Sequence, residues 1–169
     1  WDNTSPAATE AGAVTWGNGS TGVSGPVSAA GSLVGTSVND VVGNNNVTPL
    51  TNGNYVVSSP AWDNTSPTTS NAGAVTWVNG HTGLSGAVSA ANSIVGSQSN
   101  DRIGLYGAVA LTNGNYVVRS DEWNNGGISK AGAATDPTAP IGTSRGDDPG
   151  LPRPPATNAT AGGGPLMQV

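Results

Sequence analysis

The aromatic side chains are the residues of this sequence best suited to binding a ligand, and they recur at matching places. Trp16 and Trp77 hold the same position in two copies of the motif AGAVTW. An exposed indole ring can stack on a sugar, whereas a buried one supplies a large apolar area for packing. Because recurrence at a fixed spacing is typical of contacts between repeats, packing is the favoured role. The aromatic residues that recur are Trp1, Trp16, Tyr55, Trp62, Trp77, Tyr116 and Trp123.

Two pairs of aspartates also recur between the copies. Asp2 matches Asp63, and Asp40 matches Asp101, with an Asn directly before each member of the second pair. Oxygens of Asp and Asn in loops can ligate Ca²⁺. The same side chains cap turns by accepting backbone N–H groups, which needs no metal. The D-x-D-x-D-G spacing of a calcium loop does not occur, so we expect no cofactor, with Ca²⁺ as the alternative.

Residues that could catalyse a reaction do not form a recognisable set. His81 is the single histidine, and Ser20 takes its place in the other copy. Gly142–Gly146 matches a nucleophile-elbow pattern around Ser144, but it lies in Pro-rich sequence without the strand and helix that an elbow needs. The chain has no cysteine nucleophile. We therefore expect no enzyme, although two carboxylates paired by the fold would suit a glycosidase.

Two short motifs are weak signals. Arg145, Gly146 and Asp147 form a tripeptide that resembles the integrin-recognition motif, and chance matches to so short a motif are common. Five sites fit the N-x-Ser/Thr glycosylation pattern, which an Asn/Thr-rich composition produces without any function. These sites begin at Asn3, Asn18, Asn46, Asn64 and Asn158.

Charge and hydropathy exclude two classes of partner. Charged residues make up 9% of the chain, against about 25% in typical domains, and the net charge is −5. Residues 1–101 contain neither Lys nor Arg, so the clustered cations that bind nucleic acid phosphates are missing there. No apolar run approaches the ~20 residues of a membrane span, so we expect no membrane insertion. The lack of cysteine fits a secreted bacterial protein.

An internal repeat organises the chain. WDNTSP, AGAVTW and LTNGNYVV each return after about 61 residues. We assign 1–61 to repeat 1, 62–122 to repeat 2, and 123–134 to the truncated start of a third copy. Residues 135–169 form a Pro/Gly-rich tail that we expect to be extended or disordered. Because the sequence begins inside a motif, we interpret it as a piece of a longer precursor.

Turn residues inside each repeat predict hairpins. Asn52-Gly53 and Asn113-Gly114 separate β-prone runs and predict type I′ turns, in which both residues take positive φ. A second hairpin is expected to join Ala13–Trp16 to Val23–Ala29, with an equivalent in repeat 2.

Two hairpins per repeat predict an all-β fold. Val, Thr, Trp and Tyr favour sheets, and good helix formers are scarce. We expect antiparallel units of about four strands, similar to a propeller blade, with a β-solenoid as the alternative. One such unit cannot bury its own apolar face, so it must stack against others of its kind.

The combination of LTNGNYVV, SPAWDN, AGAVTWGNGSTG and GPVSAAGSLVG resembles a repeat of large bacterial secreted proteins. These are the filamentous-haemagglutinin-type proteins exported by two-partner secretion, and the similarity spans residues 1–133. The resemblance implies an extracellular or cell-surface location, a structural or adhesive role, and no catalytic residues. The favoured hypothesis is a repeat that assembles with other copies through β contacts, including into fibres. The alternatives are a module that binds surface carbohydrates and, third, a glycosidase.

Overall fold

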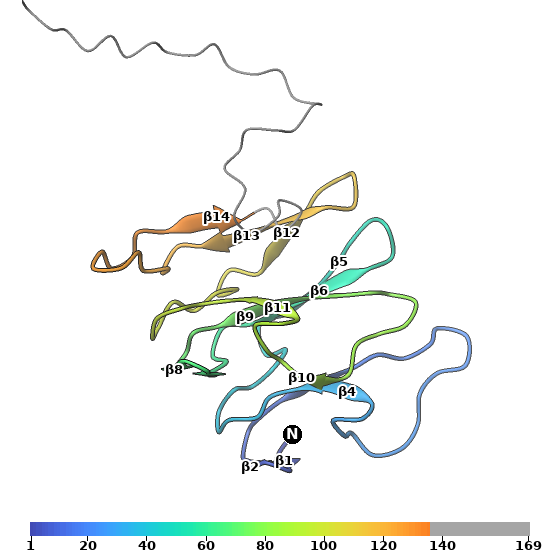
Figure 1. Cartoon of the computed structure of the whole chain (residues 1–169). Coiled ribbons are helices and arrows are strands. Elements are labelled where there is room, and N and C mark those ends of the chain that lie inside the picture. The colour runs from blue at the N-terminus through green and yellow to red at the C-terminus, as the bar shows by residue number, and fades with distance from the viewer. Residues whose placement is uncertain (136–169) are drawn as a thin grey trace, which may run out of the picture. The chain divides into compact units, whose positions relative to one another are not determined.

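The computed structural model describes residues 1–135, and all regular structure within them is β (Figure 1). The middle sheet has four strands in the order β11-β9-β6-β5, each antiparallel to its neighbour. Its strands are β5 (Asn46–Pro49), β6 (Tyr55–Ser59), β9 (Ala74–Val78) and β11 (Ser93–Val95). The all-β class and the antiparallel unit of about four strands are thus confirmed. Among the described residues there is no helix long and apolar enough to cross a membrane.

Two further sheets of three strands flank the middle sheet in the stack (Figure 1). The first contains β3 (Ala13–Thr15), β4 (Ser32–Val34) and β10 (Gly86–Ala87). The third contains β12 (Ala108–Ala110), β13 (Tyr116–Ser120) and β14 (Ala133–Thr135). Two small hairpins pair β1 (Asn3–Thr4) with β2 (Ala7–Ala8) and β7 (Asn64–Thr65) with β8 (Thr68–Thr69).

The sheets do not follow the repeat boundaries that the sequence motifs define. The middle sheet takes β5 and β6 from residues before 62, and β9 and β11 from residues after it. Thr135, assigned to the tail, is the last residue of β14. The rest of the tail lies outside the described residues. Each sheet therefore ties two sequence repeats together through backbone hydrogen bonds.

The Asn-Gly hairpins form where they were expected, but their turn type was predicted wrongly. β5 pairs with β6, and β12 with β13. Only Gly53 has a positive φ, 84°, while Asn52 keeps an ordinary one. The Gly53 N–H donates to the Leu50 carbonyl at 3.1 Å, so Thr51–Gly53 is a three-residue loop that ends in a left-handed glycine. The second hairpin repeats this geometry at Gly114, with a φ of 87°.

The second predicted hairpin has a different partner strand. β3 pairs with β4, not with Val23–Ala29, and β9 pairs likewise with β11. Burial explains the choice, because β4 is fully buried while Val23 and Val27 are 65% and 44% exposed. In repeat 2 the corresponding segment supplies β10, which leaves its own sheet and pairs in parallel with β4 of the first.

Both faces of the middle sheet are buried. Successive residues of a strand point to opposite faces. Val57 accordingly packs into a core shared with Leu33 of the first sheet, and Val56 into a core shared with Val118 of the third. Burying each such side chain contributes roughly 1.5–3 kcal/mol. Because both faces are buried, apolar residues follow one another along these strands instead of alternating with polar ones.

Candidate repeat-to-repeat interface

Polar side chains on and beside the middle sheet bond to the backbone of repeat 2 in and around the third sheet. Asn45 Nδ2 donates to the Gly104 and Leu105 carbonyls at 2.8 and 2.9 Å. Asn52 Nδ2 donates to the Gly114 carbonyl at 3.2 Å, 62 residues later. The hydroxyls of Thr48 and Thr51 extend the row with longer bonds to the carbonyls of Ala108 and Thr112, 3.5 and 3.4 Å. Each bond spans nearly one repeat period, so matching positions lie over one another.

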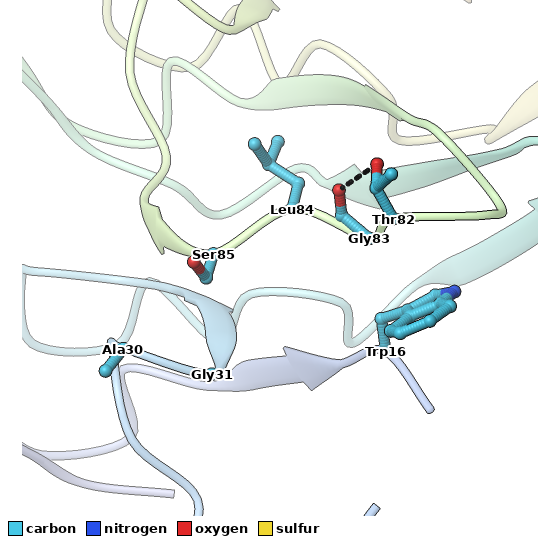
Figure 2. Close-up of a pocket in the computed structure, with 7 residues that line it drawn as sticks. All are labelled: Trp16, Ala30, Gly31, Thr82, Gly83, Leu84 and Ser85. Atoms are coloured by element: carbon cyan, nitrogen blue, oxygen red, sulfur yellow. Dashed lines mark hydrogen bonds between the residues drawn. The ribbon is translucent and has the colours of Figure 1, made fainter. Parts of the chain in front are cut away.

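Trp16 joins the first sheet to the second repeat (Figure 2). Its Nε1 donates to the Gly80 carbonyl at 2.9 Å, and Gly83 lies against its ring. The Gly80 N–H in turn donates to Asn54 Oδ1, 3.0 Å away, on the hairpin of its own sheet. The loop is therefore fixed both within its sheet and to the sheet beside it.

A cavity of about 430 Å³ opens beside Trp16. Figure 2 shows that its lining comes from both repeats, with Ala30 and Gly31 on one side and Thr82–Ser85 on the other. The lining combines the polar Thr82 and Ser85 with apolar side chains and glycines, and it carries no acidic or basic side chain. The cavity supplies room and hydrogen-bonding groups, without a group that would transfer a proton.

The other aromatic residues differ in exposure between copies. Trp62 is 3% exposed, whereas Trp1, at the same repeat position, is 40% exposed. Trp77 is 43% exposed, whereas Trp16 is half-buried. Trp123, Tyr55 and Tyr116 all pack against the two cores. The two exposed indoles thus come from different repeat positions, so the described residues present no periodic row of exposed rings.

Asp40 and Asp101 are fully buried carboxylates that tie one repeat to the next. Asp40 Oδ2 accepts the N–H groups of Thr36 and Ser37, both at 2.8 Å. Its Oδ1 accepts the N–H of Asp63, 23 residues later, at 2.9 Å. Burial raises the pKa of the Asp40 carboxyl, and these backbone donors oppose that rise.

Asp101 repeats the arrangement with Asn124. Its Oδ1 accepts the backbone N–H of Asn124 at 2.9 Å and the side-chain amide at 2.8 Å. A glycine makes room for each carboxylate, because a Cβ on Gly35 or Gly96 would lie 2.6 or 2.7 Å from the aspartate Cβ. Sequence reasoning missed these glycines, although their recurrence five residues before each aspartate was visible.

The remaining predicted site residues do not gather. Asp2 Oδ1 and Asp63 Oδ1 accept the N–H groups of Glu10 and Asn71, which braces the small hairpins. His81 lies on an exposed loop. In residues 1–135 no group of three or more His, Cys, Asp or Glu side chains is placed to hold a metal. Ser144, the Arg145-Gly146-Asp147 tripeptide and the Asn158 site lie outside the described residues.

Comparison with known proteins gives one match. A family model described as a repeat of unknown function (DUF5650) matches residues 1–44, 49–105 and 110–145. The second and third matches begin close to β5 and β12, where the middle and third sheets begin. Neither the curated proteins nor the solved structures gave a significant match.

Proposed function

Because the chain belongs to the family of this repeat of unknown function, DUF5650, which matches it three times, we propose that it is a structural repeat protein. Its action is mechanical: repeats stack on one another through β contacts, and copies associate through an exposed β segment of repeat 1. The proposal assigns it no reaction and no cofactor.

The row of side-chain bonds between matching positions is the observation that carries this proposal. Asn45, Thr48, Thr51 and Asn52 each reach backbone carbonyls 59 to 62 residues later. A backbone carbonyl is available in any repeat, whatever its side chains. The same contacts are therefore reusable between successive repeats, as in solenoid proteins whose stability is a sum of neighbour interfaces.

One segment of repeat 1 is suited to receive another copy. Val23 and Val27 are 65% and 44% exposed, whereas their repeat-2 counterparts Leu84 and Val88 pack into the core between sheets. In repeat 2 this segment pairs in parallel with β4. In repeat 1 it borders a cavity of about 550 Å³. A β4-like strand of a second copy fits this place by β-strand addition.

We further propose that the protein is extracellular and adhesive, on the strength of its motifs. LTNGNYVV and AGAVTW resemble repeats of filamentous-haemagglutinin-type bacterial surface proteins. Low charge is consistent with self-association, since little repulsion opposes close packing of copies.

Sedimentation over a wide concentration range tests the proposal. We expect the full chain to associate reversibly, and Val23→Asn with Val27→Asn to shift association to at least tenfold higher concentration. Val38→Ser is the matched control, because Val38 is 52% exposed and Ser99 takes its place in repeat 2. A chain that stays monomeric throughout, or a double variant that associates as the unaltered chain does, would rule out association through this segment.

A further inference from the structure

Two residues of repeat 1 on and beside the middle sheet, Asn45 and Ser58, touch a turn of repeat 2, and one repeat later they are replaced by residues that touch each other. Asn45 Nδ2 bonds to carbonyls of residues 102–107, here named the 102–107 turn. Ser58 is fully buried beneath Gly104 of that turn, where a Cβ on Gly104 would lie 3.4 Å from the serine Cβ. Both side chains are small, which lets the turn approach closely.

Tyr106 and Arg119 stand at the matching positions of repeat 2. The Arg119 guanidinium lies over the Tyr106 ring, 5.3 Å from its centroid. Both side chains are exposed, in contrast to Ser58. A cation held over an aromatic ring is a favourable pair, so the arginine is positioned and not merely extended into solvent.

Apart from Arg119 and Tyr106, the outward face of the third sheet is suited to packing against another sheet. Leu111 and Val109 are 37% and 49% exposed, whereas Leu50, the counterpart of Leu111, is 5% exposed in the middle sheet. Judged by its apolar side chains alone, this face would therefore pack against another sheet. The long cationic side chain of Arg119 is what distinguishes this face from its buried equivalent, and burying an unpaired charge is costly.

The positive charges of the described residues fall in the same part of the chain. Arg102 and Lys130 face Glu122 with N···O distances of 4.0 and 3.2 Å. Residues 1–101 have no Lys or Arg. A terminal unit of a stack needs a polar outer face, and an exposed cationic side chain supplies one.

We infer that the outward face of the third sheet is a capping face. Arg119, held over Tyr106, fills on the third sheet the place that the 102–107 turn takes on the middle sheet, so a further repeat does not fit there. This deepens the proposed function, on which it rests, by giving the assembly a direction: copies add at the Val23–Val27 segment and not at the third sheet.

Cysteine mapping tests the inference, because the natural chain has no cysteine. Val109→Cys reports on the third sheet and Val27→Cys on the receiving segment. Both are measured in the full chain by cross-linking between copies with a short bismaleimide, after circular dichroism confirms the fold. We expect Val109→Cys to cross-link at least tenfold less than Val27→Cys.

Restoring the repeat-1 residues supplies the decisive comparison. In the background Tyr106→Asn with Arg119→Ser, cross-linking of Val109→Cys should rise at least fivefold. Lys130→Asn is the matched control: it removes the same charge, introduces the residue of Asn71, and should leave cross-linking unchanged. Strong cross-linking of Val109→Cys in the unaltered background, or none after restoration, overturns the inference. If only Val27→Cys fails to cross-link, the proposed receiving segment is wrong. The capping face is then decided by whether Tyr106→Asn with Arg119→Ser raises the cross-linking of Val109→Cys.

Discussion

The indole of Trp16 lies directly against Gly83, 67 positions later in the sequence, so that a Cβ on the glycine would fall 2.6 Å from the tryptophan Cβ and 2.7 Å from its Cγ. Gly83 also has a φ of 68°. This contact couples the first sheet to the second repeat through a ring face and bare backbone. It makes the glycine a sensitive probe of stacking.

Gly83→Ala is expected to cost about 2–4 kcal/mol of unfolding free energy, from positive-φ strain and overpacking against Trp16 together. Gly22→Ala is the matched control, because Gly22 has a φ of 70° and open space around it. It should cost only about 1 kcal/mol. Urea unfolding measures the loss of unfolding free energy in both variants. Equal losses would show that the contact between Gly83 and Trp16 does not stabilise the fold.

Asp40→Asn should destabilise the fold by about 1–3 kcal/mol, because its amide group must face a backbone N–H that the carboxylate now accepts. Denaturant unfolding at neutral pH measures this loss. Asp63, Thr36 and Ser37 supply the three N–H groups. An unchanged midpoint would mean that the buried carboxylate does not hold the next repeat.

The raised pKa of the Asp40 carboxyl predicts that the stability of the fold depends on pH. Burial raises the folded pKa of Asp40 above 3.8, so the folded chain binds this proton more tightly than the unfolded chain. The contribution of Asp40 to stability is therefore highest in acid and falls as pH rises through the window above 3.8. The difference in unfolding free energy between the natural chain and Asp40→Asn, measured from pH 3 to 7, should shrink with rising pH. A difference that grows with rising pH would mean that folding lowers the pKa of Asp40 instead of raising it.

Asn52 and Asn113 form a matched pair for the contacts between repeats. Each accepts the N–H of the residue two positions on, Asn54 or Asn115. Asn52 also donates to the Gly114 carbonyl, and among the described residues Asn113 has no such second bond. Asn52→Ala should therefore cost about 0.5–1.5 kcal/mol more than Asn113→Ala. Equal losses of stability in thermal unfolding would show that the hydrogen bond from Asn52 to Gly114 does not stabilise the fold.

Placing the cap residues inside the stack should break it. Asn45→Tyr with Ser58→Arg puts an unpaired cation where Ser58 is fully buried, at an expected cost of about 3–5 kcal/mol. Hydrogen exchange should then show β12 and β13 losing protection while β3 and β4 keep theirs. Uniform loss across all sheets would mean that the interfaces are not separable.

Local chemistry made part of this fold predictable. The Asn-Gly pairs located both hairpins because a left-handed residue is needed there, and Gly53 and Gly114 supply it. The turn type was missed because Asn52 Oδ1 accepts the Asn54 N–H, which keeps Asn52 in an ordinary conformation. That competition between side chain and backbone is not visible in the pattern alone.

Long-range pairing was not predictable in the same way. Ser32–Val34 is too short to signal a strand, and only burial between sheets selects it over Val23–Val27. β10 joins a sheet that belongs mainly to the previous repeat. The buried role of Asp40 was half visible: turn capping was expected, but the bond to Asp63 depends on how repeats meet.

Stacking in register is the central claim, and a disulfide between matching positions measures it most directly. Thr51 Oγ1 lies 3.4 Å from the Thr112 carbonyl. In the otherwise cysteine-free chain, Thr51→Cys with Thr112→Cys should oxidise rapidly within one molecule, because a disulfide forms where Cα atoms lie within about 7 Å. Two thiols that both react with maleimide yet never form this bond would contradict the stacked arrangement.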